Sequence, residues 1–283
     1  MHQLFVLRIR TVRARIRVLL VVLAALAGAA PSRVEAQRTL NVMVSDTAIA
    51  ASPSIPAGLT TVVMNLTGKV RRELVVHRVP SGTLAADVAR GAVGRSAKWF
   101  ERWSFGGPAV PRDTLRESRA TVDLRPGQYV LVAYEVDPAG RARGDRMIWR
   151  PFSAVAASVL IPARFSDADL TIRVKDARAE VVGSIRSGQR AIRVENIGGR
   201  PHQVLIARLK PGKTVADIKG WRRDRADPPY VYVGGLTPMS GGMIAQATLV
   251  FQAGTHVVLC PLEEAPRGGH DHATALLATF TVR

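Results

Sequence analysis

The stretch Val122-Asp-Leu-Arg-Pro-Gly127-Gln-Tyr-Val-Leu-Val-Ala133 recurs later in the chain as Leu249-Val-Phe-Gln-Ala-Gly254-Thr-His-Val-Val-Leu-Cys260. Each version consists of a short apolar run, a turn that ends in glycine, and a second run rich in β-branched residues. This pattern is typical of two short strands separated by a tight turn. It therefore predicts the same strand pair in two copies of one domain.

The segments on either side of this stretch repeat as well, with only a few insertions or deletions between the copies. The offset between the copies is slightly larger at the Asn65 and Asn196 pair than at the Gly127 and Gly254 pair. A repeat of this length indicates a duplicated domain rather than the short unit of a solenoid. The matched ranges, first copy named first, are 73–80 and 203–211, 105–107 and 233–235, and 152–155 and 280–282.

Each copy contains several short β-branched runs, separated by Pro-Gly, Gly-Gly and Asp-Pro turns. Evenly spaced short strands of this kind indicate a β-sandwich. The sequence therefore predicts an all-β protein of two tandem Greek-key sandwiches, residues 38–155 and 169–283, with a linker at 156–168. Residues 84–102 and 214–225 are expected to be helical or irregular.

Residues 1–36 have the pattern of a secretory signal peptide. Five arginines precede an apolar run from Val18 to Ala30, and Val34-Glu35-Ala36 before Gln37 fits a small-residue cleavage site. The run is too short for a comfortable membrane span. We therefore expect a periplasmic or secreted protein that has no membrane span after cleavage.

The chain is strongly basic. Removing the leader's net charge of +5 from the chain's +18 leaves +13. A charge of this size is typical of proteins that bind nucleic acid. The basic residues of this chain are scattered, however, and no nucleic-acid-binding motif accompanies them. The sequence predicts no nucleic-acid partner, and favours a redox or envelope protein with an acidic surface.

Cys260 is the only cysteine of the chain. An unpaired cysteine in an exported protein is either buried and inert or bound to a metal. His202 lies well before it in the chain and His272 follows it closely, with His270 as a competitor for the same role. One thiol and two imidazoles are the residue set of a mononuclear copper site, in which we expect sulfur-to-nitrogen separations of roughly 3–4 Å.

The first copy lacks all of these side chains. Ala133 stands at the position of Cys260 and Asp145 at that of His272, and no histidine near Arg71 or Arg72 matches His202. A purely structural cysteine would not be expected to appear and vanish together with two histidines. The comparison of the copies therefore favours a metal-binding role for the second.

The second copy resembles the cupredoxin family over nearly its whole length. The matching segments are Asn196-Ile-Gly-Gly-Arg-Pro-His202, the Pro-Met-Ser-Gly-Gly turn at 238–242, Ala253-Gly-Thr-His-Val-Val-Leu-Cys260 and the closing segment from His270 to Val282. The resemblance implies two cupredoxin-like Greek-key β-sandwiches, with one copper ion in the second. The position of the usual axial methionine falls at Leu276 or Leu277, which is tolerable because the axial bond is weak.

These patterns predict one-electron transfer or copper carriage rather than substrate turnover. The alternative is a metal-free interaction or structural module of the cell envelope. An oxidase or reductase is less favoured, since multicopper oxidases need several His-x-His pairs and this chain has one, at His270 and His272. His256 aligns with Tyr129 and is expected in the core, and His77 is expected to be an ordinary strand residue.

Overall fold

Strands make up most of the chain in the computed structural model, which describes residues 38–93, 103–109, 116–136, 142–157, 164–175, 178–221, 227–262 and 275–283. The predicted leader at 1–36 lies outside these ranges. In the first half the elements are β1 (Arg38–Val44), β2 (Ile49–Ala51), β3 (Ser54–Pro56), β4 (Gly58–Leu66), β5 (Arg72–Arg78), α2 (Ala85–Val93), β6 (Glu117–Leu124), β7 (Gly127–Val136) and β8 (Ala142–Val155).

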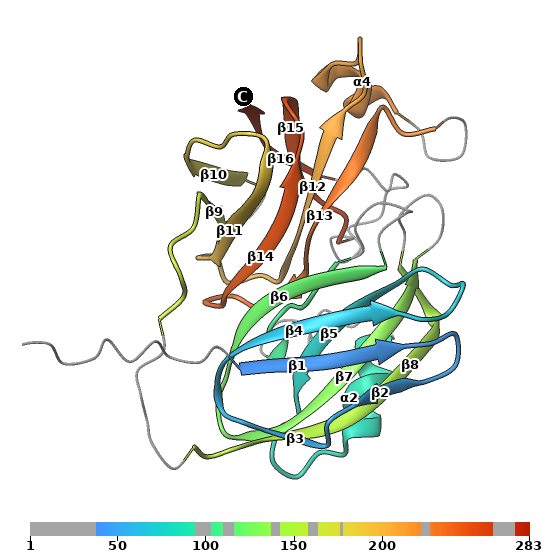
Figure 1. Ribbon diagram of the computed structural model, residues 1–283. Helices are drawn as coiled ribbons and strands as arrows, with labels where there is room; N and C mark the ends of the chain where they lie inside the picture. Colours follow the sequence, from blue (N-terminus) through green and yellow to red (C-terminus); the bar gives the residue numbers. More distant parts are fainter. Residues whose placement is uncertain are drawn as a thin grey trace, which may run out of the picture. The chain divides into compact units, whose positions relative to one another are not determined.

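Among the described residues, the second half, coloured yellow to red in Figure 1, has four strands before its helix and four after it, whereas the first half has five before and three after. The elements of the second half are β9 (Leu170–Lys175), β10 (Arg178–Gly183), β11 (Gly188–Asn196), β12 (His202–Leu209), α4 (Val215–Gly220), β13 (Tyr230–Met239), β14 (Ile244–Phe251), β15 (Gly254–Cys260) and β16 (Ala275–Val282).

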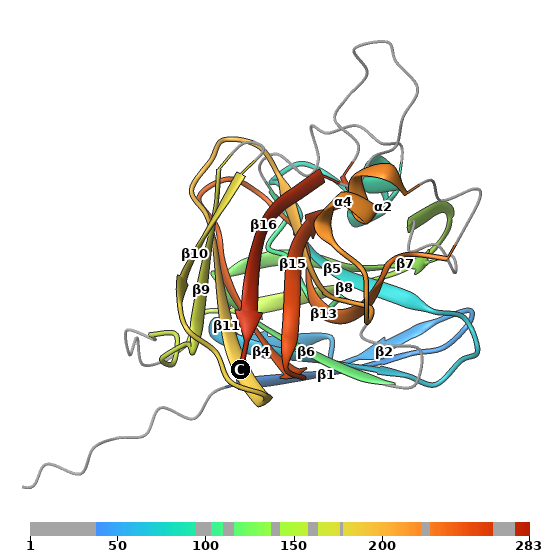
Figure 2. The same ribbon diagram turned by 90° about the horizontal axis from the view of Figure 1, so that it is seen from above.

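The strand pairing of the first half recurs in the second. β1 runs parallel to β4, which pairs antiparallel with β6; β9 and β11 do the same, with β14 in the place of β6. In the facing sheets, the order β5-β7-β8 recurs as β12-β15-β16. In Figure 2 the two layers of the second half are seen from above, with β9, β10 and β11 on one side and β13, β15 and β16 on the other. The predicted all-β class and the two tandem β-sandwiches are confirmed.

Alternating side chains supply the core between the two layers of each sandwich. In β1 the buried residues are Leu40, Val42 and Val44, while the residues between them face solvent. This is the period of two that strand geometry imposes on a sheet with one covered face.

An aromatic ring lies at the same point of each core. Tyr129 packs against Phe105 and Phe152, and its hydroxyl donates a hydrogen bond of 2.8 Å to the carbonyl oxygen of Arg125. At the matching position, His256 lies between Phe251 and Phe280, each with a ring centroid 5.4 Å away. His256 is thus a core residue, as the alignment with Tyr129 predicted.

The two helices found in the described ranges each cover the outer face of one sheet. Val88 and Ala89 of α2 pack against Val75 and Val130, and Ile218 of α4 packs in a second such cluster. Both lie in the regions expected to be helical or irregular. Neither helix is long and apolar enough to cross a membrane.

The two sandwiches share one continuous sheet, which the sequence did not predict. β6 pairs antiparallel with β14, so that four strands from each half form an eight-stranded sheet. Figure 1 shows β6 and β14 side by side at this junction. Ala120 pairs with Ala247, its own counterpart in the repeat. The halves therefore meet about a local two-fold axis, within one compact unit, Gln37–Arg283.

Two glycines of the repeated Gly-Gly pairs explain why this motif occurs in both copies. A Cβ atom on Gly107 would collide with the carbonyl oxygen of Leu74, and one on Gly235 would collide with the carbonyl oxygen of Val204. Gly235 also has a φ of +150°, which side-chain-bearing residues rarely adopt. Close approach of two backbones thus requires glycine at both positions.

Candidate metal centre

Cys260 is the last residue of β15, and its side chain is 6% exposed among the core residues of the second sandwich. β15 pairs with β12 on one side and with β16 on the other. Cys260 itself pairs with Ala275 of β16, and the pairing with β12 ends one residue earlier, at Leu259, so the thiol lies at the end of the sandwich where the strand leaves the sheet.

His202 is the first residue of β12 and is 7% exposed. Its Nδ1 atom lies 3.8 Å from the Sγ atom of Cys260. At this separation a deprotonated thiol and a neutral imidazole can bind one metal ion between them. The structure thus brings together two of the four predicted site residues, from strands that lie far apart in the sequence.

His270 and His272, the other two predicted ligands, lie outside the described residues. Within the part of the chain that is described, no group of three or more His, Cys, Asp or Glu side chains has the arrangement of a metal site. Of the two predicted axial positions, Leu277 is buried.

The loop before His202 is fixed by Asn196, which is almost fully buried. Its side-chain nitrogen donates to the carbonyl oxygens of Arg200, at 2.8 Å, and Met239, at 3.0 Å. Its side-chain oxygen accepts a hydrogen bond from the backbone of Gly198. The amide therefore closes the loop at 197–201 and ties the start of β12 to the end of β13.

Met239 is the residue that sequence reasoning missed at this site. It pairs with His202 across the ladder between β12 and β13, and it is fully buried. The Pro-Met-Ser-Gly-Gly turn at 238–242 is one of the segments that carry the cupredoxin resemblance, but Met239 was not among the predicted site residues. The strand β13 thus forms the wall beside the start of β12, with Met239 paired to His202 across the ladder.

Arg72 occupies, in the first half, the position that His202 has in the second. Arg72 starts β5 and His202 starts β12. Two residues further on, Leu74 pairs with Ala133, the counterpart of Cys260. The first half therefore has a guanidinium group and a methyl group where the second half has an imidazole and a thiol.

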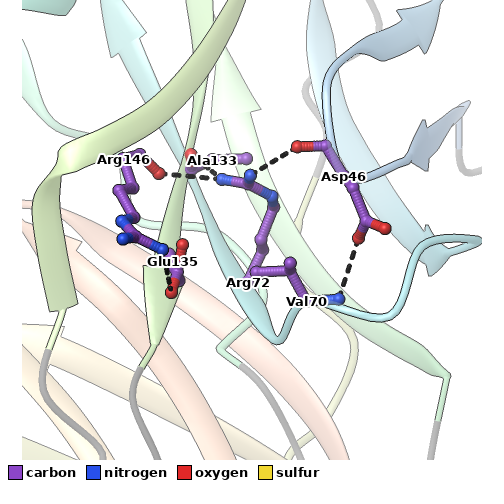
Figure 3. A network of polar contacts seen from close by, with 6 residues as sticks. All are labelled: Asp46, Val70, Arg72, Ala133, Glu135 and Arg146. Carbon is purple, nitrogen blue, oxygen red and sulfur yellow. Dashed lines mark hydrogen bonds and ion pairs between the residues drawn. The ribbon is translucent and has the colours of Figure 1, made fainter.

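The Arg72 side chain is only 4% exposed and donates hydrogen bonds to three backbone carbonyl oxygens, as Figure 3 shows. Its Nη1 atom donates to Ala133 at 3.3 Å and to Arg146 at 2.9 Å, and its Nη2 atom donates to Asp46 at 2.7 Å. Burial lowers the pKa of Arg72, while the carboxylates of Glu135 and Asp46 oppose that shift. A fixed organic cation thus joins β5, β7, β8 and the turn after β1.

His77 is a fully buried residue of β5, as expected for an ordinary strand residue. Its Nε2 atom lies 3.5 Å from the hydroxyl of Tyr134. Burial lowers the pKa of His77 to about 3 and raises that of Tyr134. Both groups are therefore uncharged at neutral pH.

We predict that His77 makes the protein sensitive to acid. In the unfolded chain its pKa is about 6.5, so between pH 6.5 and about 3 the unfolded state binds a proton that the folded state does not. The free energy of unfolding should then fall by up to about 1.4 kcal/mol per pH unit on acidification through this window. Denaturant titrations at pH 7, 6 and 5 measure that slope.

The control for this prediction is His77→Leu, which has no proton to gain. Its stability should fall less steeply between pH 6.5 and 5 than that of the wild-type chain. Tyr134, whose hydroxyl lies 3.5 Å from His77, and Glu73, which pairs with Tyr134, remain in both proteins. An identical slope for the two proteins would show that other groups cause the acid sensitivity.

Comparisons with known proteins find likeness among solved structures alone. No protein-family model matches the sequence, and neither does any curated protein. The copper-containing nitrite reductase from Thermus scotoductus SA-01 is 9% identical, with 88% of this chain and 62% of that chain covered and a TM-score of 0.26. This chain thus spans less than two thirds of that protein.

Two proteins from Nitrosomonas europaea are similar to about the same degree. The blue copper oxidase is 12% identical, covering 87% of this chain and 85% of that one, with a TM-score of 0.23. The copper nitrite reductase is also 12% identical, covering 87% and 93%, with a TM-score of 0.23. What these proteins bind or catalyse is not carried over to this chain.

Proposed function

We propose that the second half of this protein binds one copper ion through Cys260 and His202, and that the protein serves one-electron transfer or copper carriage. The observation that carries the proposal is the 3.8 Å approach of the Cys260 sulfur to Nδ1 of His202 at a buried position. His272 or His270 would supply the next ligand.

The donor set fits copper. A thiolate is a soft ligand that favours copper, and imidazole binds copper well. When bound, copper supplies a centre that gains and loses one electron. The chain's own residues bind and orient: Cys260 loses its proton, His202 presents Nδ1, and burial of both side chains keeps bulk water away from the thiolate.

The first half has no equivalent donor set, because Arg72 and Ala133 stand at the positions of His202 and Cys260. A guanidinium group repels a metal cation and has no lone pair to donate. We therefore expect a stoichiometry of one ion per chain. The basic charge and the leader pattern at 1–36 support an exported protein with an acidic redox or envelope partner.

Copper titration of the purified chain that begins at Gln37 tests this proposal. We expect one equivalent of Cu(II) to bind and to produce an intense visible absorption, which arises from charge transfer between the thiolate and the metal. Zn(II), which accepts the same ligands but has no such transition, is the matched control and should bind without colour. Failure to bind copper would favour the alternative, a metal-free interaction module.

A further inference from the structure

A short segment of the first half, Ser104 to Ala109, completes the sheet that carries the candidate metal centre. β13 is the edge strand of that four-stranded sheet. Its outer edge is covered by this segment through bridges between Phe105 and Met239 and between Pro108 and Leu236. On its other side, the same segment bonds to β5, for example from the Phe105 nitrogen to the Val76 oxygen at 2.9 Å. We refer to Ser104 to Ala109 as the joining segment.

The joining segment binds the end of β13 near Met239 most closely. The Ser104 nitrogen donates to the Ser240 hydroxyl at 2.9 Å, and the Ser240 nitrogen donates to the Ser104 oxygen at 2.9 Å. The Ser104 hydroxyl also donates to the carbonyl oxygen of Pro238. Met239, between Pro238 and Ser240, is thus held by the first half on one edge and faces His202 on the other.

Thr237 and Gln203 add two side-chain bonds across the same boundary. The Thr237 hydroxyl donates to the carbonyl oxygen of Leu74 at 3.0 Å, and the Thr237 nitrogen donates to the oxygen of Gly107 at 3.0 Å. The Gln203 side chain, one residue after His202, donates to the Glu73 carboxylate at 2.8 Å. All of these bonding side chains are buried.

We propose that the first half is a positioning half: through the joining segment and β5, it fixes the wall of the metal centre formed by β13 and the start of β12. The inference rests on the proposed copper site and assigns a role to the copy that lacks ligands. Thr237 and Ser104 are its positioning residues. They touch no metal ligand and act by holding the strand that pairs with His202.

The physical reason lies in the pairing of β12 and β13. This ladder is irregular between His202 and Val204, so the imidazole is not fixed by a regular succession of strand pairs. Asn196 ties the His202 loop to the carbonyl oxygen of Met239. Any shift of Met239 therefore moves the His202 loop relative to Cys260, and contacts that orient ligands in this way commonly change metal affinity by 10- to 100-fold.

The test compares Thr237→Val, which removes the bond to Leu74 with little change of shape, with Thr237→Ser, which keeps the hydroxyl. Thr61→Val is the matched control, because its hydroxyl bond to Thr121, 2.9 Å long, lies in the shared sheet. In the full chain we expect Thr237→Val to weaken copper binding by roughly 10-fold or more and to shift the visible band. Thr237→Ser and Thr61→Val should retain wild-type affinity and spectrum.

A copper-free measurement separates this inference from the proposed function. The rate at which iodoacetamide modifies Cys260, the only cysteine, reports how often the wall opens in the apo protein. We expect Thr237→Val to raise that rate roughly 3- to 10-fold, the factor that corresponds to the loss of one buried hydrogen bond.

Failure of the wild-type chain to bind copper would overturn the proposed function, and the thiol rate would still decide the role of the first half. If iodoacetamide modifies Cys260 no faster in Thr237→Val than in Thr61→Val, the positioning role is wrong. It is also wrong if the wild-type chain binds copper and Thr237→Val keeps its affinity and spectrum.

Discussion

Replacing Cys260 by serine should abolish the visible absorption of the copper-loaded protein and weaken copper binding by at least about 100-fold. Cys260 is the only cysteine of the chain and therefore the only residue that can supply a thiolate. The charge-transfer band requires this thiolate. A serine hydroxyl is a hard donor that does not lose its proton at neutral pH, so it replaces neither the charge nor the softness of the thiolate. Absorption spectra and competition with a chelator of known affinity measure both effects.

The control for this prediction is His256→Phe. His256 is a buried imidazole on the same strand as Cys260, but it packs between Phe251 and Phe280 in the core. A phenylalanine there preserves the ring contacts, so the visible band should persist. Retention of the band in Cys260→Ser, or its loss in His256→Phe, would show that the ligands have been misassigned.

The repeat explains how much of the fold could be predicted. Paired turns and closing segments at matched offsets require equivalent strands, and β7 and β15 do begin at Gly127 and Gly254. The His256 and Tyr129 pair illustrates the same point for the core. Alternating burial and turn glycines are local properties, so a single sequence contains them.

The junction between the halves could not be predicted in the same way. β6 and β14 pair through ordinary edge-strand residues such as Ala120 and Ala247, and backbone hydrogen bonds between edges leave no pattern of side chains. The joining segment from Ser104 to Ala109 likewise has no side-chain pattern that predicts its pairing with β13. The exception is Gly107, where the close approach of another backbone requires glycine. Met239 was not predicted as part of the site, because only the backbone pairing of β12 and β13 places it opposite His202.

Arg72 shows a different limit. The comparison of the two copies showed only that no histidine stands near this position. The sequence alone does not distinguish a buried arginine from an exposed one. Three carbonyl oxygens from distant segments, at Asp46, Ala133 and Arg146, determine its role. Their convergence is a product of the folded backbone alone.

Replacing Arg72 by methionine should lower the free energy of unfolding by about 3–5 kcal/mol. Methionine fills most of the same volume but donates no hydrogen bond, so three carbonyl oxygens at the end of the first sandwich lose their donor together. Leaving one buried acceptor unsatisfied costs about 1–3 kcal/mol, and bonds to a charged donor lie at the upper end. Chemical denaturation of the chain beginning at Gln37 measures the loss.

Arg116→Met is the matched control, because Arg116 also donates to a backbone oxygen, that of Gly68, but from an exposed position. Water can replace that donor, so the control should change stability by no more than about 0.5 kcal/mol. A loss below about 1 kcal/mol for Arg72→Met would mean that water reaches the three oxygens. A large loss would instead establish that the first half is closed by its own cation at the position where the second half has an imidazole and a thiol.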